Sequence, residues 1–271
     1  MISVLILTKN EERDLPGALA SVAWSDDVHV FDSHSTDATV QIARAAGAQV
    51  HSRAFDDYAT HRNAALATTF KYPWVFLLDA DERPTAELCA EMQRVVCEAP
   101  ENTAGFRLRR RDYLFGTWLK HAQLTPFYIR LVQPERAKYT RTINEVLEVN
   151  GPIAELAHPL DHYPFSKGFT VWIAKHNTYS TMEAELIVRQ QVLQNPSLRV
   201  AIFDADFHTR RLHQKALFYR MPARPLIKWI YMMFVRGAVL DGAAGVTYAT
   251  LQAFYEFMIV LKTKELRRGG A

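Results

Sequence analysis

The sequence predicts an α/β protein with a mostly parallel β-sheet, helices on both faces of the sheet and a helical C-terminal region. Short apolar segments rich in β-branched residues recur through the first eighty residues, and segments with helix signals separate them. The last third of the chain is helical in pattern and unusually apolar. A chain of 271 residues is long enough for one sizeable core, or for one domain with an appendage.

The first half alternates strand and helix signals. The strands are expected at residues 2–7, 28–32, 49–52 and 74–78. The helices are expected at residues 12–22, 37–46, 58–70 and 85–98. Thr8 or Asn10 is expected to cap the first helix, Pro16 lies in its first turns, and Gly47 ends the second helix. This order predicts parallel strands joined by helices that cover both faces.

The second half is less regular. Short strands of mixed direction are expected at residues 106–108, 128–132 and 145–149, and prolines mark the loops between them. From Gly168 the chain is expected to be helical, with residues 183–194 as the clearest helix.

A pair of carboxylates follows the most apolar strand. Asp79 and Asp81 are separated by the small residue Ala80, and in extended backbone their side chains point to the same side. Ligands of doubly wound sheets bind at the carboxyl ends of the strands. Two carboxylates there suit a hard divalent cation, Mg²⁺ or Mn²⁺, which can bridge the phosphates of a diphosphate.

Polar clusters also follow the first two strands, at residues 8–11 and 32–37, so three strand ends converge on one sheet edge. The glycine-rich loops of dinucleotide-binding and phosphate-binding folds are missing, since residues 7–17 contain only Gly17. Phosphate must then be held by a metal and by side chains.

Four stretches in the first hundred residues together carry a resemblance. They are Val4–Glu11, Asp32–Thr39, His61–Leu66 and Leu78–Glu82. The sequence resembles the family 2 glycosyltransferases, which are inverting enzymes of the GT-A fold. This implies a catalytic domain over 1–165, with a nucleotide-sugar-binding half (1–100) and an acceptor-binding half (101–165), followed by a helical region over 166–271.

The resemblance also implies roles for individual residues. Those implied for the nucleotide-sugar are Thr8, Asn10, Glu11, Asp32, Ser33, Arg62, Asp79, Ala80 and Asp81. Asp81 matches the direct metal ligand, Asp79 matches a position at the ribose or at the metal through water, and His162 matches a histidine that completes the metal site. Glu145 matches the family's general base, with Asp112 as the alternative base.

Within that family the second half is similar to bacterial lipopolysaccharide core glucosyltransferases. The stretches that carry this similarity are Arg111–His121, Ile129–Leu131, Asn144–Glu145, Asp161–Tyr163, Tyr179–Ala184 and Gly237–Gly242. The similarity implies transfer of a sugar, glucose by analogy, from a UDP-sugar to a lipopolysaccharide core or related glycolipid.

A dense basic run at residues 107–111 is either a solvated strand or a surface that recognises an anionic acceptor, since arginine pairs well with phosphate and carboxylate. The residues expected to bind the acceptor are Arg109, Arg111, Lys120 and Arg130. A net charge of +3 and the lack of a recognition motif argue against nucleic acid as a partner.

Two apolar segments, residues 226–240 and 246–261, lie near the C-terminus and are interrupted by charges. Aromatic residues beside basic ones suit helices that lie on an anionic membrane, although packing on the main domain or on a second copy of the chain is the alternative. With only two cysteines and no disulfide framework, the expected location is cytoplasmic, on the inner face of the cytoplasmic membrane.

Two other functions fit parts of this pattern. A nucleotidyltransferase also combines a parallel sheet with acidic metal ligands, but it calls for a glycine-rich loop near the N-terminus that this sequence lacks. A nucleotide-sugar-binding protein without transfer activity would share the donor residues and lack the base.

Overall fold

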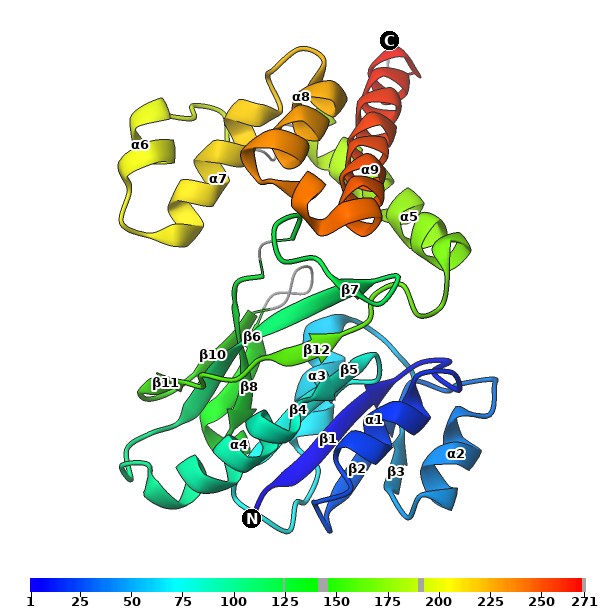
Figure 1. Cartoon of the computed structure of the whole chain (residues 1–271), viewed down its shortest axis with the longest axis vertical. Helices are drawn as coiled ribbons and strands as arrows, with labels where there is room; N and C mark the ends of the chain where they lie inside the picture. The colour runs from blue at the N-terminus through cyan, green and yellow to red at the C-terminus, as the bar shows by residue number, and fades with distance from the viewer. Residues whose placement is uncertain (124, 141–145, 190–192, 270–271) are drawn as a thin grey trace. The chain divides into compact units, whose positions relative to one another are not determined.

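The computed structural model describes residues 1–123, 125–140, 146–189 and 193–269 of the chain (Figure 1). The chain divides into two compact units. The αβ unit comprises Met1–Tyr113 and Thr125–Ser166, and the helical unit comprises Leu114–Leu124 and Lys167–Ala271. The sequence placed a boundary after residue 165 and assigned residues 114–124 to the first domain, whereas this segment groups with the helical unit.

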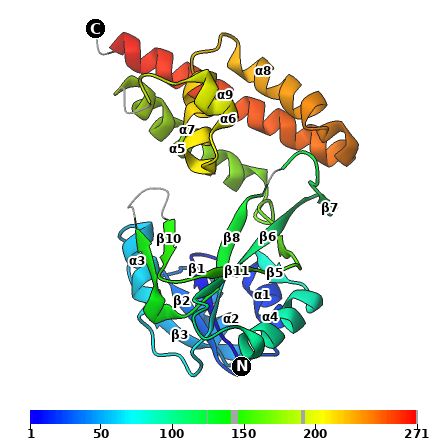
Figure 2. The ribbon, with the colours of Figure 1, turned by 90° about the vertical axis from the view of Figure 1, so that its left-hand side faces the viewer.

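The αβ unit is built around one mixed sheet with the strand order β3-β2-β1-β4-β8-β6-β12-β5 and with β11 beside β6 (Figure 2). Strands β3, β2, β1 and β4 are parallel, β8 is antiparallel to both of its neighbours, and β12 is parallel to β6. The bounds are β1 (Ser3–Thr8), β2 (Val28–Asp32), β3 (Gln49–Ser52), β4 (Val75–Asp79), β5 (Glu82–Pro84), β6 (Gly105–Leu114), β8 (Phe127–Val132), β11 (Ile153–Glu155) and β12 (Leu160–His162).

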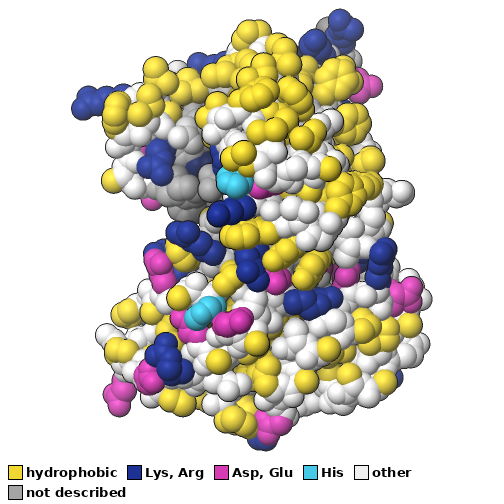
Figure 3. Space-filling model, viewed as in Figure 1, with side chains coloured by type: hydrophobic (Ala, Val, Ile, Leu, Met, Phe, Trp, Pro, Cys, Tyr) yellow, Lys and Arg dark blue, Asp and Glu magenta, His cyan; other side chains and the backbone are white. Residues whose placement is uncertain are grey.

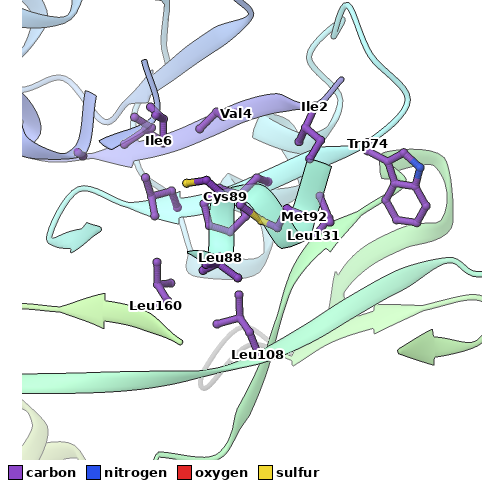
Figure 4. Packing of buried hydrophobic residues seen from close by; sticks show 14 of the residues in the cluster. Ile2, Val4, Ile6, Trp74, Leu88, Cys89, Met92, Leu108, Leu131 and Leu160 are labelled. Atoms are coloured by element: carbon purple, nitrogen blue, oxygen red, sulfur yellow. The ribbon is translucent and has the colours of Figure 1, made fainter. Parts of the chain in front are cut away.

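Alternate residues of the central strands supply two hydrophobic cores. Val4 and Ile6 of β1 pack with Leu88 of helix α4 (Ala86–Glu98) in one core, which Figure 4 shows. Leu5 packs with Leu66 of helix α3 (Tyr58–Leu66) in the other. Because successive side chains of a strand point to opposite faces, this pattern requires helices on both sides. The predicted fold class is therefore confirmed.

The helices of the αβ unit are α1 (Leu15–Ser21), α2 (Thr39–Ala45), α3 (Tyr58–Leu66) and α4 (Ala86–Glu98). All four expected helices and all four expected strands of the first half are present. The predicted cap of α1 is wrong, because Asp14 occupies that position. Thr8 ends β1 and bonds to Asp32, and Asn10 bonds to the loop at residues 35–36.

The second half departs further from expectation. Strand β6 extends well beyond the predicted residues 106–108, because its exposed arginines alternate with buried residues such as Leu108 and Asp112. Strands β9 (Ala137–Thr140) and β10 (Val146–Val149) form a separate antiparallel pair. The short strands β5, β9, β11 and β12 were not predicted.

The helical unit contains α5 (Phe169–Val188), α6 (Leu198–Phe203), α7 (Phe207–Phe218), α8 (Arg224–Ile230) and α9 (Gly242–Gly269). Between α8 and α9 lie a π-helical turn, η2 (Tyr231–Val235), and a 3₁₀ turn, η3 (Ala238–Asp241), while β7 (Thr117–Trp118) lies in the segment 114–124. Helix α5 begins directly after Gly168 as predicted. The predicted helix at 183–194 overlaps the end of α5 over residues 183–188. Residues 189, 193 and 194 are not helical, and residues 190–192 lie outside the described part.

Asp241 explains why the segment 114–124 belongs to the helical unit. Its buried carboxylate accepts hydrogen bonds from the backbone N–H groups of His121 and Ala122, at 2.9 and 2.7 Å, and contacts the His121 ring at 2.6 Å. Leu119 and Ala122 are also buried.

One helical stretch among the described residues, Ala238–Gly269, is long and apolar enough to cross a membrane by length and composition. These two criteria alone are a weak indication, since core helices of other proteins also satisfy them.

Candidate active site

Three polar strand ends meet at the carboxyl edge of the sheet. Thr8 at the end of β1 pairs in register with Asp32 of β2, and Leu7 pairs with Asp79 of β4. The strands are parallel neighbours, so their carboxyl ends lie at the same edge. The structure thus brings together the clusters that the sequence placed at one edge.

The loops after β1 and β2 are tied together by Asp32. Its carboxylate accepts hydrogen bonds from the Thr8 hydroxyl at 2.9 Å and from the backbone N–H and hydroxyl of Ser35 at 2.8 and 2.5 Å. The residue is only 1% exposed. Asp32 therefore positions both loops, rather than presenting a free carboxylate at the surface.

Asn10 and Ser33 add further ties. Asn10 lies in the left-handed region, with φ of 54°, which asparagine tolerates better than most residues. Its backbone N–H donates to Ser35 and its side-chain oxygen accepts from the backbone of Thr36. The hydroxyl of Ser33, a buried residue, lies 2.8 Å from Nε2 of His61 in α3.

Asp79 is held by two arginines. Its Oδ1 lies 3.3 Å from Arg62 of α3, and its Oδ2 lies 2.9 Å from Arg130 of β8. Burial alone would raise the pKa of Asp79, but the charges of Arg130 and Arg62 outweigh burial and hold the pKa well below its usual range. Both carboxylate oxygens are therefore engaged by cations from distant parts of the sequence.

Asp81, His162 and Asp112 form a chain of contacts. Nδ1 of His162 lies 2.5 Å from Oδ1 of Asp112, and Nε2 of the same ring lies 3.4 Å from Oδ2 of Asp81. Strand β12 creates this arrangement, because His162 pairs in register with Asp112 of β6 on one side and with Glu82 of β5 on the other. The unpredicted strands β5 and β12 thus bring His162 to the aspartates.

The charges of Asp81, His162 and Asp112 stabilise one another. Burial lowers the pKa of His162, but the hydrogen bonds to Asp112 and Asp81 more than compensate and raise that pKa to about 9. Burial alone would raise the pKa of Asp81, but the hydrogen bond and the charge of His162 outweigh burial and lower this pKa. Without a bound cation, these interactions favour the protonated imidazole of His162 at neutral pH. A cation that binds Nε2 would have to replace the proton on that nitrogen.

The chemistry of Asp81 and His162 fits a divalent cation. Two ligands of an octahedral ion, each about 2.1 Å from it and at right angles, lie about 3 Å apart, close to the observed 3.4 Å. A carboxylate that orients the far nitrogen of a histidine ligand is a common feature of metal sites, and Asp112 occupies that position. Among the described residues, no group of three or more His, Cys, Asp or Glu side chains is placed to enclose an ion.

A buried charge cluster lies beside this site. Oε1 of Glu82, which is fully buried, lies 2.6 Å from Arg130 and 3.3 Å from Arg110. The sequence predicted that Arg130 binds the acceptor, but this side chain is buried and engaged with Glu82 and Asp79. It supports the site from within the protein.

Strand alternation divides the predicted basic surface. Arg107, Arg109 and Arg111 share one face of β6, whereas Arg110 points toward the other face with Asp112. Arg109 is exposed, with its guanidinium 4.5 Å from the centre of the Phe127 ring. Arg111 lies 2.6 Å from Asp161.

Two other predicted residues are not placed with the site. Lys120 is exposed and belongs to the helical unit, with its ammonium 5.7 Å from the centre of the Trp118 ring. Glu145, the predicted general base, lies outside the described residues.

Sequence reasoning missed Glu82 and Arg110 as parts of the site. Glu82 directly follows the Asp79–Asp81 motif, and Arg110 shares its strand face with Leu108 and Asp112. Side chains of a strand alternate between its two faces, so treating all of residues 105–114 as one strand would have placed Arg110 on the interior face.

The chain is similar to an uncharacterized glycosyltransferase of Rickettsia bellii, 26% identical with coverage of 98% of this chain and 86% of that protein. It is also similar to the lipopolysaccharide core biosynthesis glycosyltransferase LpsC of Rhizobium meliloti, 26% identical with coverage of 96% of this chain and 91% of that protein.

Among solved structures, glucosyl-3-phosphoglycerate synthase from Mycobacterium tuberculosis in complex with uridine-diphosphate matches 50% of this chain and 57% of that chain, with 21% identity and a TM-score of 0.39. This likeness is too low to carry over a ligand. The family model described as glycosyl transferase family 2 matches residues 3–151, which is more than half of the 271 residues. Those residues include both loops tied by Asp32 and the aspartates at the end of β4, and the chain belongs to glycosyl transferase family 2.

Proposed function

We propose that this protein is a metal-dependent, inverting hexosyltransferase that moves a sugar, with glucose as the first candidate, from a UDP-sugar to a lipopolysaccharide core or related glycolipid. The observation that carries the proposal is the chain from Asp81 through His162 to Asp112 at the carboxyl edge of the sheet. Family membership supports glycosyl transfer, and the name of the Rhizobium relative supports the acceptor class.

The donor is proposed to lie over the loops after β1, β2 and β4. In this proposal Asn10, Glu11 and Ser33 line the donor. Thr8 and Asp32 hold the first two loops together through their hydrogen bond. The backbone of Ala80 separates the two aspartates. Arg62, which contacts Asp79, contributes a positive charge next to the proposed diphosphate. Because Asp79 is already bound by two arginines, we assign it to donor positioning and not to direct metal coordination.

Asp81 and His162 are proposed to hold Mg²⁺ or Mn²⁺ together with the diphosphate of the donor. When bound, the cation neutralises the charge that develops on the departing nucleoside diphosphate. Asp112 keeps Nδ1 of His162 occupied, so that Nε2 faces Asp81.

Inversion requires a base that removes the acceptor proton as the acceptor oxygen attacks the anomeric carbon from the side opposite the leaving UDP. Glu145 remains our proposal for this base. Asp112, the alternative, is buried and within 2.5 Å of His162 and 3.8 Å of Arg110, so we assign it to positioning. Arg109 and Arg111 on β6 are proposed to bind anionic groups of the acceptor.

A thermal-shift panel of nucleotide-sugars, with and without Mn²⁺ or Mg²⁺, tests the proposal. We expect UDP and UDP-glucose to raise the melting temperature only when the cation is present, because the cation joins the diphosphate to the protein. Equal shifts without the cation would contradict metal-dependent binding. Formation of a product with the same anomeric configuration as the donor would contradict inversion.

Asp112→Asn tests the positioning role. This variant keeps the size of the side chain but removes the charge that orients His162, so we expect the affinity for Mn²⁺ in the presence of UDP to fall about 10-fold to 100-fold. Titration of Mn²⁺ by calorimetry measures this change. Asp161→Asn alters the neighbouring aspartate of β12, which pairs with Arg111, and is expected to leave the affinity for Mn²⁺ unchanged.

A further inference from the structure

The helical unit exposes many large apolar side chains. In Figure 3, hydrophobic side chains cover much of this unit on the face shown. In the segment from α8 to η3 they include Phe234, which is 67% exposed, and Val235 and Leu240, both 71% exposed. The other members in this segment are Leu226, Ile230, Tyr231 and Val239. A cluster of this kind is unusual on a protein surface that faces only water.

Helix α9 continues this surface. Its exposed apolar residues Val246, Phe254, Phe257 and Leu261 fall within about 80° of one another at 100° per residue, so they form one stripe. Only 28% of the most apolar window of this helical stretch is buried. The stripe therefore lies outside the core of the unit.

Trp229 joins the two sets of residues. Its indole nitrogen donates a hydrogen bond to Thr250 at 3.2 Å, and Thr250 lies within the stripe of α9. Its ring also contacts Phe234 edge to face, with centroids 6.2 Å apart. The exposed residues of 226–240 and the stripe of α9 are thus parts of one surface, which we call the apolar–aromatic surface.

The opposite side of α9 is fixed by polar contacts. Glu256 is buried and pairs with Arg224 of α8 at 3.2 Å. The ammonium of Lys262 donates hydrogen bonds to Asn177, Ser180 and Thr181 of α5. A helix bound in this way to α5 and α8 cannot present an apolar surface all around, as a spanning helix would.

Basic residues extend the stripe toward the C-terminus. Lys264 follows Val246 by about five helical turns and therefore points in the same direction. Arg267 and Arg268 lie in the last turn, and all three residues are exposed. Arg224 is paired with Glu256 inside the unit and adds no charge to this end. Lys264, Arg267 and Arg268 outnumber the exposed Glu265 beside them, so this end carries a net positive charge.

We propose that the apolar–aromatic surface, together with Lys264, Arg267 and Arg268, docks the protein onto the surface of an anionic phospholipid bilayer without crossing it. Aromatic and aliphatic side chains enter the boundary between headgroups and acyl chains, and the basic end contacts anionic headgroups. A second copy of the chain is a poorer occupant, because a two-fold interface apposes identical patches and a lysine- and arginine-rich end adds repulsion. The inference concerns membrane binding and does not depend on the proposed transfer reaction.

Vesicle flotation of the full chain tests the proposal. Vesicles of phosphatidylethanolamine with phosphatidylglycerol are expected to retain the protein, and neutral phosphatidylcholine vesicles are expected to bind it far less. Phe254→Asp combined with Phe257→Asp should lower the partition coefficient at least about tenfold, because two charges replace apolar anchors. Ile153→Asp on β11 of the αβ unit changes a side chain of similar exposure, 38% against 44% and 45%, and should leave partitioning unchanged.

Replacement of Lys264, Arg267 and Arg268 by Gln tests the electrostatic part separately. We expect a loss of about a hundredfold on anionic vesicles, since each basic residue near the surface contributes about 1 kcal/mol. Circular dichroism confirms that each variant keeps its helices. The proposal is overturned by equal binding to neutral and anionic vesicles, or by unchanged flotation of the aspartate variant. It is also overturned if the unaltered protein is a dimer that the aspartate variant converts to a monomer while vesicle binding persists. Protein that resists extraction at alkaline pH would show that the helix crosses the bilayer and would overturn it as well.

Discussion

Asp81→Ala is expected to lower kcat/KM for glycosyl transfer at least about a thousandfold, which corresponds to ~4 kcal/mol of transition-state stabilisation. The substitution removes the carboxylate that faces Nε2 of His162 at 3.4 Å and that we propose as a cation ligand. Without it the diphosphate loses the ion that offsets its growing charge, so kcat should fall more than the affinity for the sugar. Steady-state kinetics and the cation-dependent thermal shift with UDP measure the two effects.

Asp26→Ala is the matched control for this experiment. Asp26 is an exposed aspartate that precedes β2, at the opposite edge of the sheet, where it pairs with Lys71. Its removal should leave transfer unchanged. Asp81→Asn separates charge from size, and we expect it to be nearly as inactive as the alanine variant. Transfer by Asp81→Ala within tenfold of the unaltered protein would show that the proposed cation site is wrong.

The first half of the fold could be predicted because each element is encoded locally. Strand β4 is apolar up to its last residue, Asp79, and Thr85 caps α4 by accepting a hydrogen bond from the backbone of Leu88. Such signals need no knowledge of distant contacts. The convergence of Thr8, Asp32 and Asp79 followed from topology alone, since parallel neighbouring strands end at the same edge.

The support of the site could not be predicted, because it is made by residues distant in sequence. Arg130 lies 51 positions from Asp79, and His162 lies 50 positions from Asp112. Arginine and aspartate are usually exposed, so nothing in the sequence marks Arg130 and Asp112 as buried. Only the pairing of β8 with β4, and of β12 with β6 and β5, reveals that these residues are partners.

The grouping of 114–124 with the helical unit has a similar cause. Asp241 fixes this segment through the backbone of His121 and Ala122, about 120 residues earlier. A backbone donor carries no signature in the sequence, so the contact is invisible until the helical unit is folded. For this reason Lys120 was predicted to act with Arg109, although the two residues belong to different units.

Arg130→Ala is expected to lower the free energy of unfolding of the αβ unit by about 3–5 kcal/mol, because it leaves the buried carboxylate of Glu82 and one oxygen of Asp79 without their strongest cation. Hydrogen exchange of the backbone amides in β4 and β8 reports this unit separately from the helical unit. An acceptor-binding arginine on the surface would give a different result, namely weaker acceptor binding with little loss of stability. The experiment therefore distinguishes the structure from the prediction made from sequence.

Arg109→Ala is the matched control, since Arg109 is exposed and its contact with Phe127 accounts for about 1 kcal/mol or less. A second variant tests the cause of the loss. When Glu82→Gln is combined with Arg130→Ala, the buried negative charge is gone, so part of the lost stability should return and the two changes should not be additive. Additive losses would mean that Arg130 stabilises the unit by packing rather than by neutralising Glu82. Recovery in the double variant would show that Arg130 is needed because Glu82 is a buried negative charge beside the proposed cation site.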